Sequence, residues 1–81
     1  MHVKLACLPH VVEPVRDRLP NSRVVGHDGV RTILTAKVFG EGFGRWALPY
    51  GAAIEVLEPK ALREEIAAAA KAIAAMYEAD T

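Results

Sequence analysis

The sequence is poor in the features that define several large classes of protein. It contains a single cysteine, Cys7, which excludes an internal disulfide and provides no cysteine-based zinc site. No apolar run approaches the ~18 residues of a membrane span, and the apolar stretch at the N-terminus is too short for a signal peptide. Basic and acidic residues both number 10, so no net charge attracts nucleic acid or membrane to the whole chain. These absences predict a soluble, cytoplasmic domain with no membrane partner.

Groups that carry catalysis or hold cofactors are also scarce. Ser22 is the only serine, and no base is evidently paired with it, so a hydrolytic triad has no support. The histidines lack the spacing typical of metal ligands. The glycine-rich stretch at 39–44 lacks the third glycine position of a dinucleotide-binding loop and the parallel βαβ unit around it. We therefore expect no enzymatic activity, no metal and no cofactor.

The chain of 81 residues is long enough for one small domain, and its first half alternates between strand and helix patterns. Residues 2–8 alternate in polarity, which predicts a half-buried strand. Residues 9–19 carry valine and leucine at helical spacing. Pro14 lies inside this segment and removes a backbone donor, so we expect a helix that is short or starts late.

Residues 22–38 give the clearest local signal in the sequence. Two runs rich in β-branched residues flank Asp28-Gly29, a pair suited to the positive φ angles of a tight hairpin. The alternation in the second run places Leu34 on one face, and Arg31 and Lys37 on the other. Because two cations share that second face, we expect it to be the wetter one.

The second half of the chain contains a loop, a strand and a long helix. Residues 39–51 predict a loop followed by about two turns of helix, and residues 52–58 predict a fourth strand. Residues 60–78 are rich in alanine and carry an apolar stripe at helical intervals. Pro59 separates the last two elements; proline is tolerated where a helix begins and favours extended geometry in the residue before it. We therefore expect the strand to pass into the helix without a loop.

The resulting order is β-α-β-β-α-β followed by a terminal helix. This order predicts an α+β fold, a ferredoxin-like sandwich over residues 1–81 with an additional C-terminal helix. Right-handed crossovers place the first and third strands in the middle of an antiparallel sheet. The first two helices are expected to cover one face of that sheet, and the other face is open, or covered by the terminal helix or by another domain.

The segment from Arg45 to Tyr77 resembles the end of the bacterial WYL-domain transcriptional regulators, in the C-terminal extension called WCX. Members of that family carry a short helix with a tryptophan, then a glycine, the motif EVLEP, the motif LRE and an alanine- and leucine-rich helix. The matching residues are Arg45, Trp46, Gly51, Glu55, Val56, Leu57, Glu58, Pro59, Leu62, Arg63, Glu64 and Tyr77. The hairpin around Asp28-Gly29 is also similar to the family's hairpin. The chain departs from the family pattern in the glycine content of 39–44 and in Pro49 within the short helix.

The resemblance implies a non-catalytic regulatory module that contributes to effector sensing and dimerisation. It implies a homodimer, with a WYL domain and a helix-turn-helix domain in the same parent chain. Because neither domain is evident here, we expect residues 1–81 to be a single WCX-like domain excised from a longer regulator. In some members of the family the effector is a short single-stranded DNA, so a single-stranded DNA or nucleotide effector is the expectation. Two alternatives stay open: an ACT-like module that binds a small molecule, and a purely structural dimerisation domain.

The residues expected to contact a nucleic-acid effector are cationic. Lys4, Arg31 and Lys37 fall on the predicted wetter face of the sheet, and Arg45 follows in the glycine-rich region. Each contact between such a side chain and a phosphate adds salt-dependent affinity. A solvated strand face, or a face packed on another domain, is an alternative reading of these side chains, and Glu55 is expected to weaken the local field if it shares their face.

Overall fold

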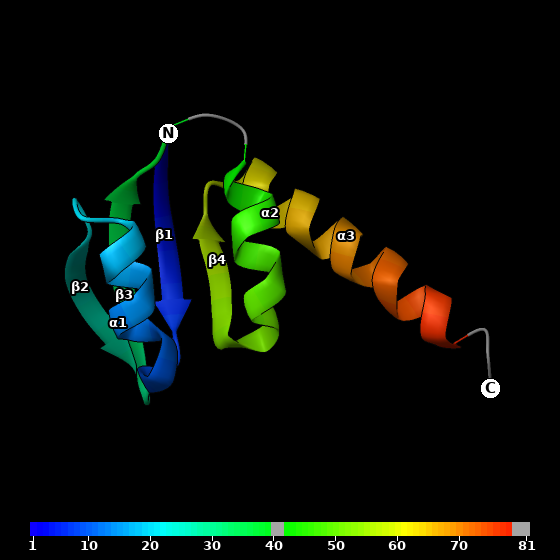
Figure 1. The fold of residues 1–81 in the computed structure, drawn as a ribbon, viewed down its shortest axis with the longest axis horizontal. Helices are drawn as coiled ribbons and strands as arrows, with labels where there is room; N and C mark the ends of the chain where they lie inside the picture. Colours follow the sequence, from blue (N-terminus) through cyan, green and yellow to red (C-terminus); the bar gives the residue numbers. More distant parts are fainter. Residues whose placement is uncertain (40–41, 79–81) are drawn as a thin grey trace.

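The computed structural model describes residues 1–39 and 42–78, and over these residues the chain forms one four-stranded sheet, three α-helices and one 3₁₀ helix (Figure 1). The predicted α+β class is confirmed. In chain order the elements are β1 (His2–Cys7), α1 (Pro9–Arg18), β2 (Arg23–Asp28), β3 (Arg31–Lys37), α2 (Phe43–Ala47), η1 (Leu48–Ala53), β4 (Ile54–Glu58) and α3 (Lys60–Glu78). Gly40 and Glu41, in the stretch predicted to be a loop, lie outside the described residues.

The sheet has the strand order β2-β3-β1-β4, and each neighbouring pair is antiparallel. β1 and β3 therefore lie in the middle. Leu5 in β1 is opposite Leu34 in β3 on one side and opposite Val56 in β4 on the other. A tight turn joins β2 to β3 at the predicted place, but its two central residues are Gly29 and Val30 rather than Asp28 and Gly29, because Asp28 ends β2 and pairs with Arg31. Gly29 adopts a φ of 61°, which glycine reaches without strain.

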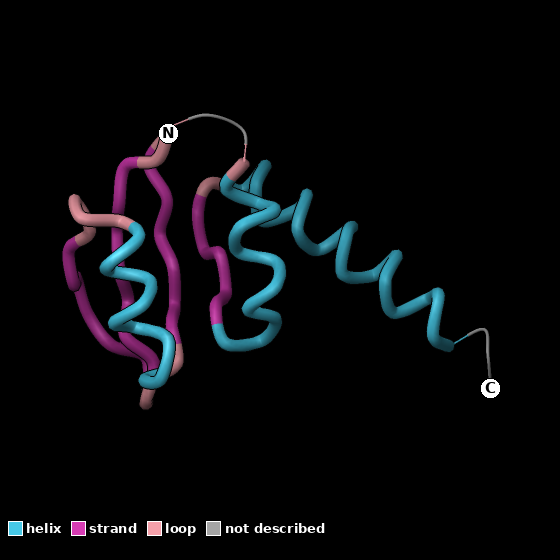
Figure 2. Tube along the Cα trace, in the orientation of Figure 1, coloured by secondary structure: helices cyan, strands magenta, loops and turns pink. Residues whose placement is uncertain are grey.

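The hydrophobic core lies between the sheet and the layer formed by α1 and α2, which pack on the same face (Figure 2). Leu5 and Leu34 at the centre of the sheet are fully buried. Val15 of α1 and Phe43 of α2 close over them from the helix layer. As the alternation of apolar residues in β1 and β3 predicted, one face of each strand lies in the core.

The first helix corrects one expectation. We predicted that Pro14 would shorten or delay it, but α1 begins at Pro9 and continues through Pro14 to Arg18. A proline in the first turn is tolerated because its N–H would have no helical partner. Pro14 does lose one backbone hydrogen bond, but Val11 and Val15 on either side of it are buried against the sheet. Their burial favours the helix more than the missing bond opposes it.

The joint between β4 and α3 has the form that the sequence predicted. β4 ends at Glu58, α3 begins at Lys60, and Pro59 is the only residue between them. The Arg63 N–H donates to the Pro59 carbonyl at 3.1 Å, which closes the first turn of the helix. Because no loop intervenes, the direction of α3 is tied to the direction of the strand that precedes it.

The terminal helix extends away from the rest of the domain (Figure 1). Leu62 in its first turn is buried, Ile66 and Ala69 are partly covered, and beyond them every described residue is exposed. The Cα radius of gyration is 13.2 Å, against about 12 Å for a compact domain of this length, as expected when one helix projects. Across residues 1–39 and 42–78, no helix has both the length and the hydropathy required to cross a bilayer.

Candidate functional site

The predicted cations do not all lie on one surface. Lys4 is opposite Thr35 in the β1–β3 register, and Arg31 and Lys37 share the face of Thr35 because alternate residues of a strand point the same way. That face is opposite the one covered by α1 and α2, and we call it the open face. Arg45 is exposed on α2, in the helix layer. The structure therefore brings Lys4, Arg31 and Lys37 onto one face and leaves Arg45 on the other side of the sheet.

Arg31 is held in an ion-pair cluster with carboxylates of its own chain. Its Nη1 donates to Glu55 Oε1 at 2.6 Å, and its Nη2 donates to Asp28 Oδ2 at 2.5 Å. Arg63 of α3 reaches the second oxygen of the same glutamate, with Nη1 to Oε2 at 3.1 Å. We call these four residues the Arg31 cluster. Two guanidinium groups face two carboxylates, so the cluster has no net charge and does not present Arg31 as a free cation.

The hydrogen bonds of the cluster perturb its titration. The hydrogen bond from Arg31 lowers the pKa of Glu55 below its ordinary value, against a smaller opposing effect of burial. The same bond, followed by the one to Asp28, raises the pKa of Arg31. Glu55 is therefore ionised at neutral pH and weakens the positive field of the open face, as the sequence suggested it would if it lay there.

Lys4 and Lys37 keep their charge available. Over residues 1–39 and 42–78, neither lysine lies within ion-pairing distance of a carboxylate. The Lys37 ammonium lies 5.6 Å from the centre of the Phe39 ring, within cation–π range. The backbone of Lys37 is held by Asn21, whose amide donates to the Lys37 carbonyl at 3.0 Å and accepts from its N–H at 3.1 Å.

Two further arginines contribute to this side of the molecule, and sequence reasoning missed both. Arg23 in β2 is opposite Thr35, so Arg23, Thr35 and Lys4 form a row across three strands of the open face. The alternation of residues along β2 did not show which face Arg23 occupies, because a bulge between Val24 and Gly26 interrupts the pairing of β2 with β3. Arg63 joins the Arg31 cluster from α3, and no local pattern relates a helix residue to a strand carboxylate that precedes it in the chain.

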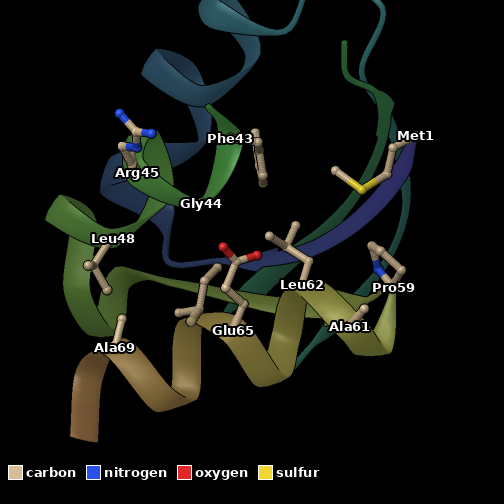
Figure 3. Close-up of a pocket in the computed structure, with 11 residues that line it drawn as sticks. Met1, Phe43, Gly44, Arg45, Leu48, Pro59, Ala61, Leu62, Glu65 and Ala69 are labelled. Atoms are coloured by element: carbon tan, nitrogen blue, oxygen red, sulfur yellow. The ribbon is translucent and has the colours of Figure 1, made fainter. Parts of the chain in front are cut away.

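A groove lies between α2, η1 and the first half of α3 (Figure 3). It encloses about 560 Å³. Apolar side chains form most of its lining, namely Met1, Phe43, Leu48, Leu62, Ile66 and Ala69. Arg45 lies on the α2 side with its guanidinium directed away from the groove, and Glu65 of α3 directs its carboxylate toward it (Figure 3). Arg45 thus lies at the edge of this groove, on the side of the sheet opposite the open face.

The aromatic residues of α2 and η1 pack against one another and against the core. Trp46 packs partly against the core, with its ring centre 5.2 Å from that of Phe43 and 5.3 Å from that of Tyr50. This row of rings joins α2 to η1 and gives Trp46 a packing role. Tyr77 is different, because 69% of its surface is exposed on the free end of α3.

Among the residues that the structure describes, the remaining reactive groups form no assembled site. Burial raises the pKa of the Cys7 thiol to about 11, so the thiol stays protonated at neutral pH, as expected for an inert core cysteine. Ser22 is buried, and its hydroxyl accepts from Arg16 Nε at 3.4 Å. In the residues that the structure describes, no three side chains of the types that ligate metals come together.

Comparison with known proteins gives one match. The model of the WCX domain matches residues 1–74, which is nearly the whole chain. The matched region includes the open face, the Arg31 cluster, the groove and all but the last turn of α3. No curated protein and no solved structure matches the chain.

Proposed function

Because the chain belongs to the WCX domain family, we propose that it is the non-catalytic regulatory domain of a WYL-type transcriptional regulator. In this role it contributes to effector sensing and to dimerisation, beside a WYL domain and a helix-turn-helix domain of the same parent chain in the cytoplasm. The match over residues 1–74 carries the proposal. We also assign the sheet to the ferredoxin-like class, since its element order and its central β1 and β3 agree with a split βαβ arrangement.

We assign the effector contacts to the open face rather than to all of the predicted cations. Lys4 and Lys37 are free of carboxylate partners in the described part of the chain, and Arg23 lies in the same cross-strand row as Lys4. Adjacent strands are about 5 Å apart, so Arg23 and Lys4 are about 10 Å apart across β3. A row of cations at that spacing suits the phosphates of a single strand that crosses the sheet. Arg31 is paired with Glu55 and Asp28, and Arg45 lies in the helix layer on the other side of the sheet.

The scarcity of aromatic rings near the open face, among the residues that the structure describes, limits how the effector is recognised. Sequence-tolerant binding of single strands usually combines cations with aromatic rings on which bases stack. Phe39, beside Lys37 at the end of β3, is 79% exposed and is the one ring near this face among the described residues. We therefore expect binding dominated by phosphate contacts, with strong dependence on salt and little on base identity.

Fluorescence anisotropy with a labelled short single-stranded DNA, on the intact regulator, tests the assignment. The Lys4→Ala/Lys37→Ala variant is expected to bind more weakly and to lose about 1.4 from the slope of log affinity against log salt, at about 0.7 for each phosphate contact. The matched control is Lys60→Ala/Lys71→Ala, which removes the same number of the same charges from α3. If the first pair leaves the affinity and slope as they are in the control, the open face does not hold the effector.

A further inference from the structure

A second hollow in the surface lies where β3 ends. It is formed by the connection between α1 and β2, by the last residues of β3 and their continuation, and by the start of α2, and it encloses about 510 Å³. We call it the β3-end pocket. Its volume falls within the range of pockets that hold small molecules.

The charged side chains that line the β3-end pocket are cations without a carboxylate partner. Arg18, the last residue of α1, and Lys37, the last residue of β3, both line it and are both exposed. Within residues 1–39 and 42–78, neither side chain forms an ion pair. The described lining contains no aspartate or glutamate. The pocket is therefore complementary in charge to an anion.

The two other hollows in the described surface do not share this property. The groove between α2 and α3 receives the carboxylate of Glu65 (Figure 3). The hollow beside β4 contains Arg31 and Arg63, and both of them are bound to Glu55. An anionic ligand is therefore expected to favour the β3-end pocket over either of them.

Aromatic rings in the same lining select a flat ligand. Phe39, Phe43 and Trp46 all line the pocket. Phe39 is 79% exposed, and the Lys37 ammonium lies 5.6 Å from the centre of its ring. An exposed ring provides a surface on which any nucleobase can stack, and a cation beside the ring is placed to contact the phosphate of the same nucleotide. A nucleoside phosphate combines the flat ring and the negative charge that this lining suits.

Two sides of the pocket are fastened to each other before any ligand binds. The side chain of Asn21, in the connection after α1, donates to the Lys37 carbonyl at 3.0 Å and accepts from the Lys37 N–H at 3.1 Å. These bonds tie the segment that carries Arg18 to the end of β3, where Lys37 and Phe39 lie. A site held in this way loses less conformational entropy when it binds a ligand.

We propose that the β3-end pocket binds the phosphorylated terminal nucleotide of the effector strand. A terminal phosphate monoester carries up to two negative charges at neutral pH, which matches the two cations better than the single charge of an internal phosphodiester. The proposal rests on the proposed function and names the part of the effector that is recognised. A free nucleoside monophosphate presents the same chemistry and is the alternative source of the ligand.

The pocket continues the open face. Lys37 shares the face of Thr35 and lies two residues beyond it, which is about 7 Å along β3. Thr35 belongs to the row that contains Arg23 and Lys4. A strand whose internal phosphates contact that row can therefore place its last nucleotide in the pocket.

Competition against a labelled short single-stranded DNA, on the intact regulator, tests the proposal. The unlabelled competitors have one sequence and carry hydroxyl groups at both ends, a 5′-phosphate or a 3′-phosphate. One of the phosphorylated forms is expected to compete at least about fivefold better than the hydroxyl form. Arg18→Ala is expected to abolish this advantage. Arg45→Ala is the matched control, because it removes the same exposed side chain from a position outside the pocket lining.

A second pair of variants tests the aromatic part of the site. Phe39→Ala is expected to weaken the binding of every strand by at least about fivefold, the low end of the range for one stacked base. Tyr77→Ala is its control, because that ring is 69% exposed on α3 and does not line the pocket. All four substituted residues are exposed, and circular dichroism verifies that each variant folds. If Phe39→Ala binds like Tyr77→Ala, no base stacks in the pocket and the proposal is wrong.

The remaining outcomes separate the pocket from the open face. Lys37 belongs to both, so Lys4 and Arg18 distinguish them: Lys4→Ala should weaken phosphorylated and hydroxyl strands equally, and Arg18→Ala should weaken only the phosphorylated ones. If neither terminal phosphate adds affinity, or if the advantage survives Arg18→Ala, the pocket is not a phosphate site, and the Lys4→Ala/Lys37→Ala titration still decides the open face.

Calorimetric titration with thymidine 5′-monophosphate covers the case in which no single strand binds. Binding to wild type that Arg18→Ala abolishes would support the pocket, would identify a free nucleotide as its ligand and would overturn the strand on the open face. Failure of both the strands and the mononucleotide to bind would overturn the pocket and the open face together.

Discussion

The centre of the sheet and the free half of α3 carry similar apolar side chains, but those in the sheet are buried and those on the helix are exposed. Leu5 and Leu34 are fully buried because α1 and α2 close over the β1–β3 pair. Ile73 and Met76 are exposed because the described chain places nothing opposite them. A periodic apolar pattern therefore specifies which face of a helix or strand can be buried. Whether that face is buried within the same domain depends on a second element that packs against it.

The largest contrast is expected from truncating one residue in each region. Leu34→Ala leaves a cavity beneath α1 and should lower the free energy of unfolding by about 2–5 kcal/mol, a large part of the stability of a small domain. Ile73→Ala removes no intramolecular contact in the core and should change it by less than about 0.5 kcal/mol. Urea denaturation at concentrations where the chain is monomeric measures both. Equal losses at the two positions would show that α3 packs on its own domain.

An intermediate effect is expected where the helix layer passes into β4. Gly51 adopts φ 58° and ψ −131°, a conformation that side chains rarely permit. Gly51→Ala should therefore destabilise the domain by about 1–3 kcal/mol, although no atom blocks the added methyl group. Gly26→Ala is the control, since that glycine has no positive φ and equally open space around its Cα. Thermal denaturation that ranks the two variants alike would contradict the strain at Gly51.

The smallest effect is expected from the ion pairs that fasten the start of α3 to the sheet. Glu55→Gln should destabilise the domain by less than Gly51→Ala, because the side chains of the Arg31 cluster are all partly exposed and solvent screens their ion pairs. The pKa of Glu55 is lowered on folding, so its contribution is present above its ordinary value of 4.5 and is lost as the pH falls through the folded value.

Denaturant titrations of wild type and Glu55→Gln at neutral and acidic pH measure that difference. The two stabilities should differ at neutral pH and converge well below pH 4.5. A difference that stays constant across this range would mean that the carboxylate charge is not what stabilises the cluster.

Local sequence signals predicted most of the architecture. Alternation identified the buried faces of β1 and β3, the Asp28-Gly29 pair identified the hairpin, and Pro59 identified the joint between β4 and α3. These features depend on residues close together in the chain. The continuation of α1 through Pro14 was missed, because burial by the sheet outweighs the local cost of proline and depends on distant residues.

The candidate site was less predictable than the fold. Alternation placed Lys4, Arg31 and Lys37 on one face, but it did not show that Arg31 pairs with Glu55, from another strand, and Asp28. It also did not place Arg45 in the helix layer, since that position depends on how α2 packs. The sequence predicted that the stripe of α3 is apolar. It did not predict where along the helix the stripe stops being buried, because that depends on the shape of the domain beside the helix.

The one-residue link at Pro59 makes α3 a lever arm fixed to the edge of the sheet. An arm of about 28 Å converts a tilt of about 10° at its base into a swing of about 5 Å at its tip. A small reorientation of β4 is thereby magnified at the far end of the molecule, without any hinge or change of secondary structure.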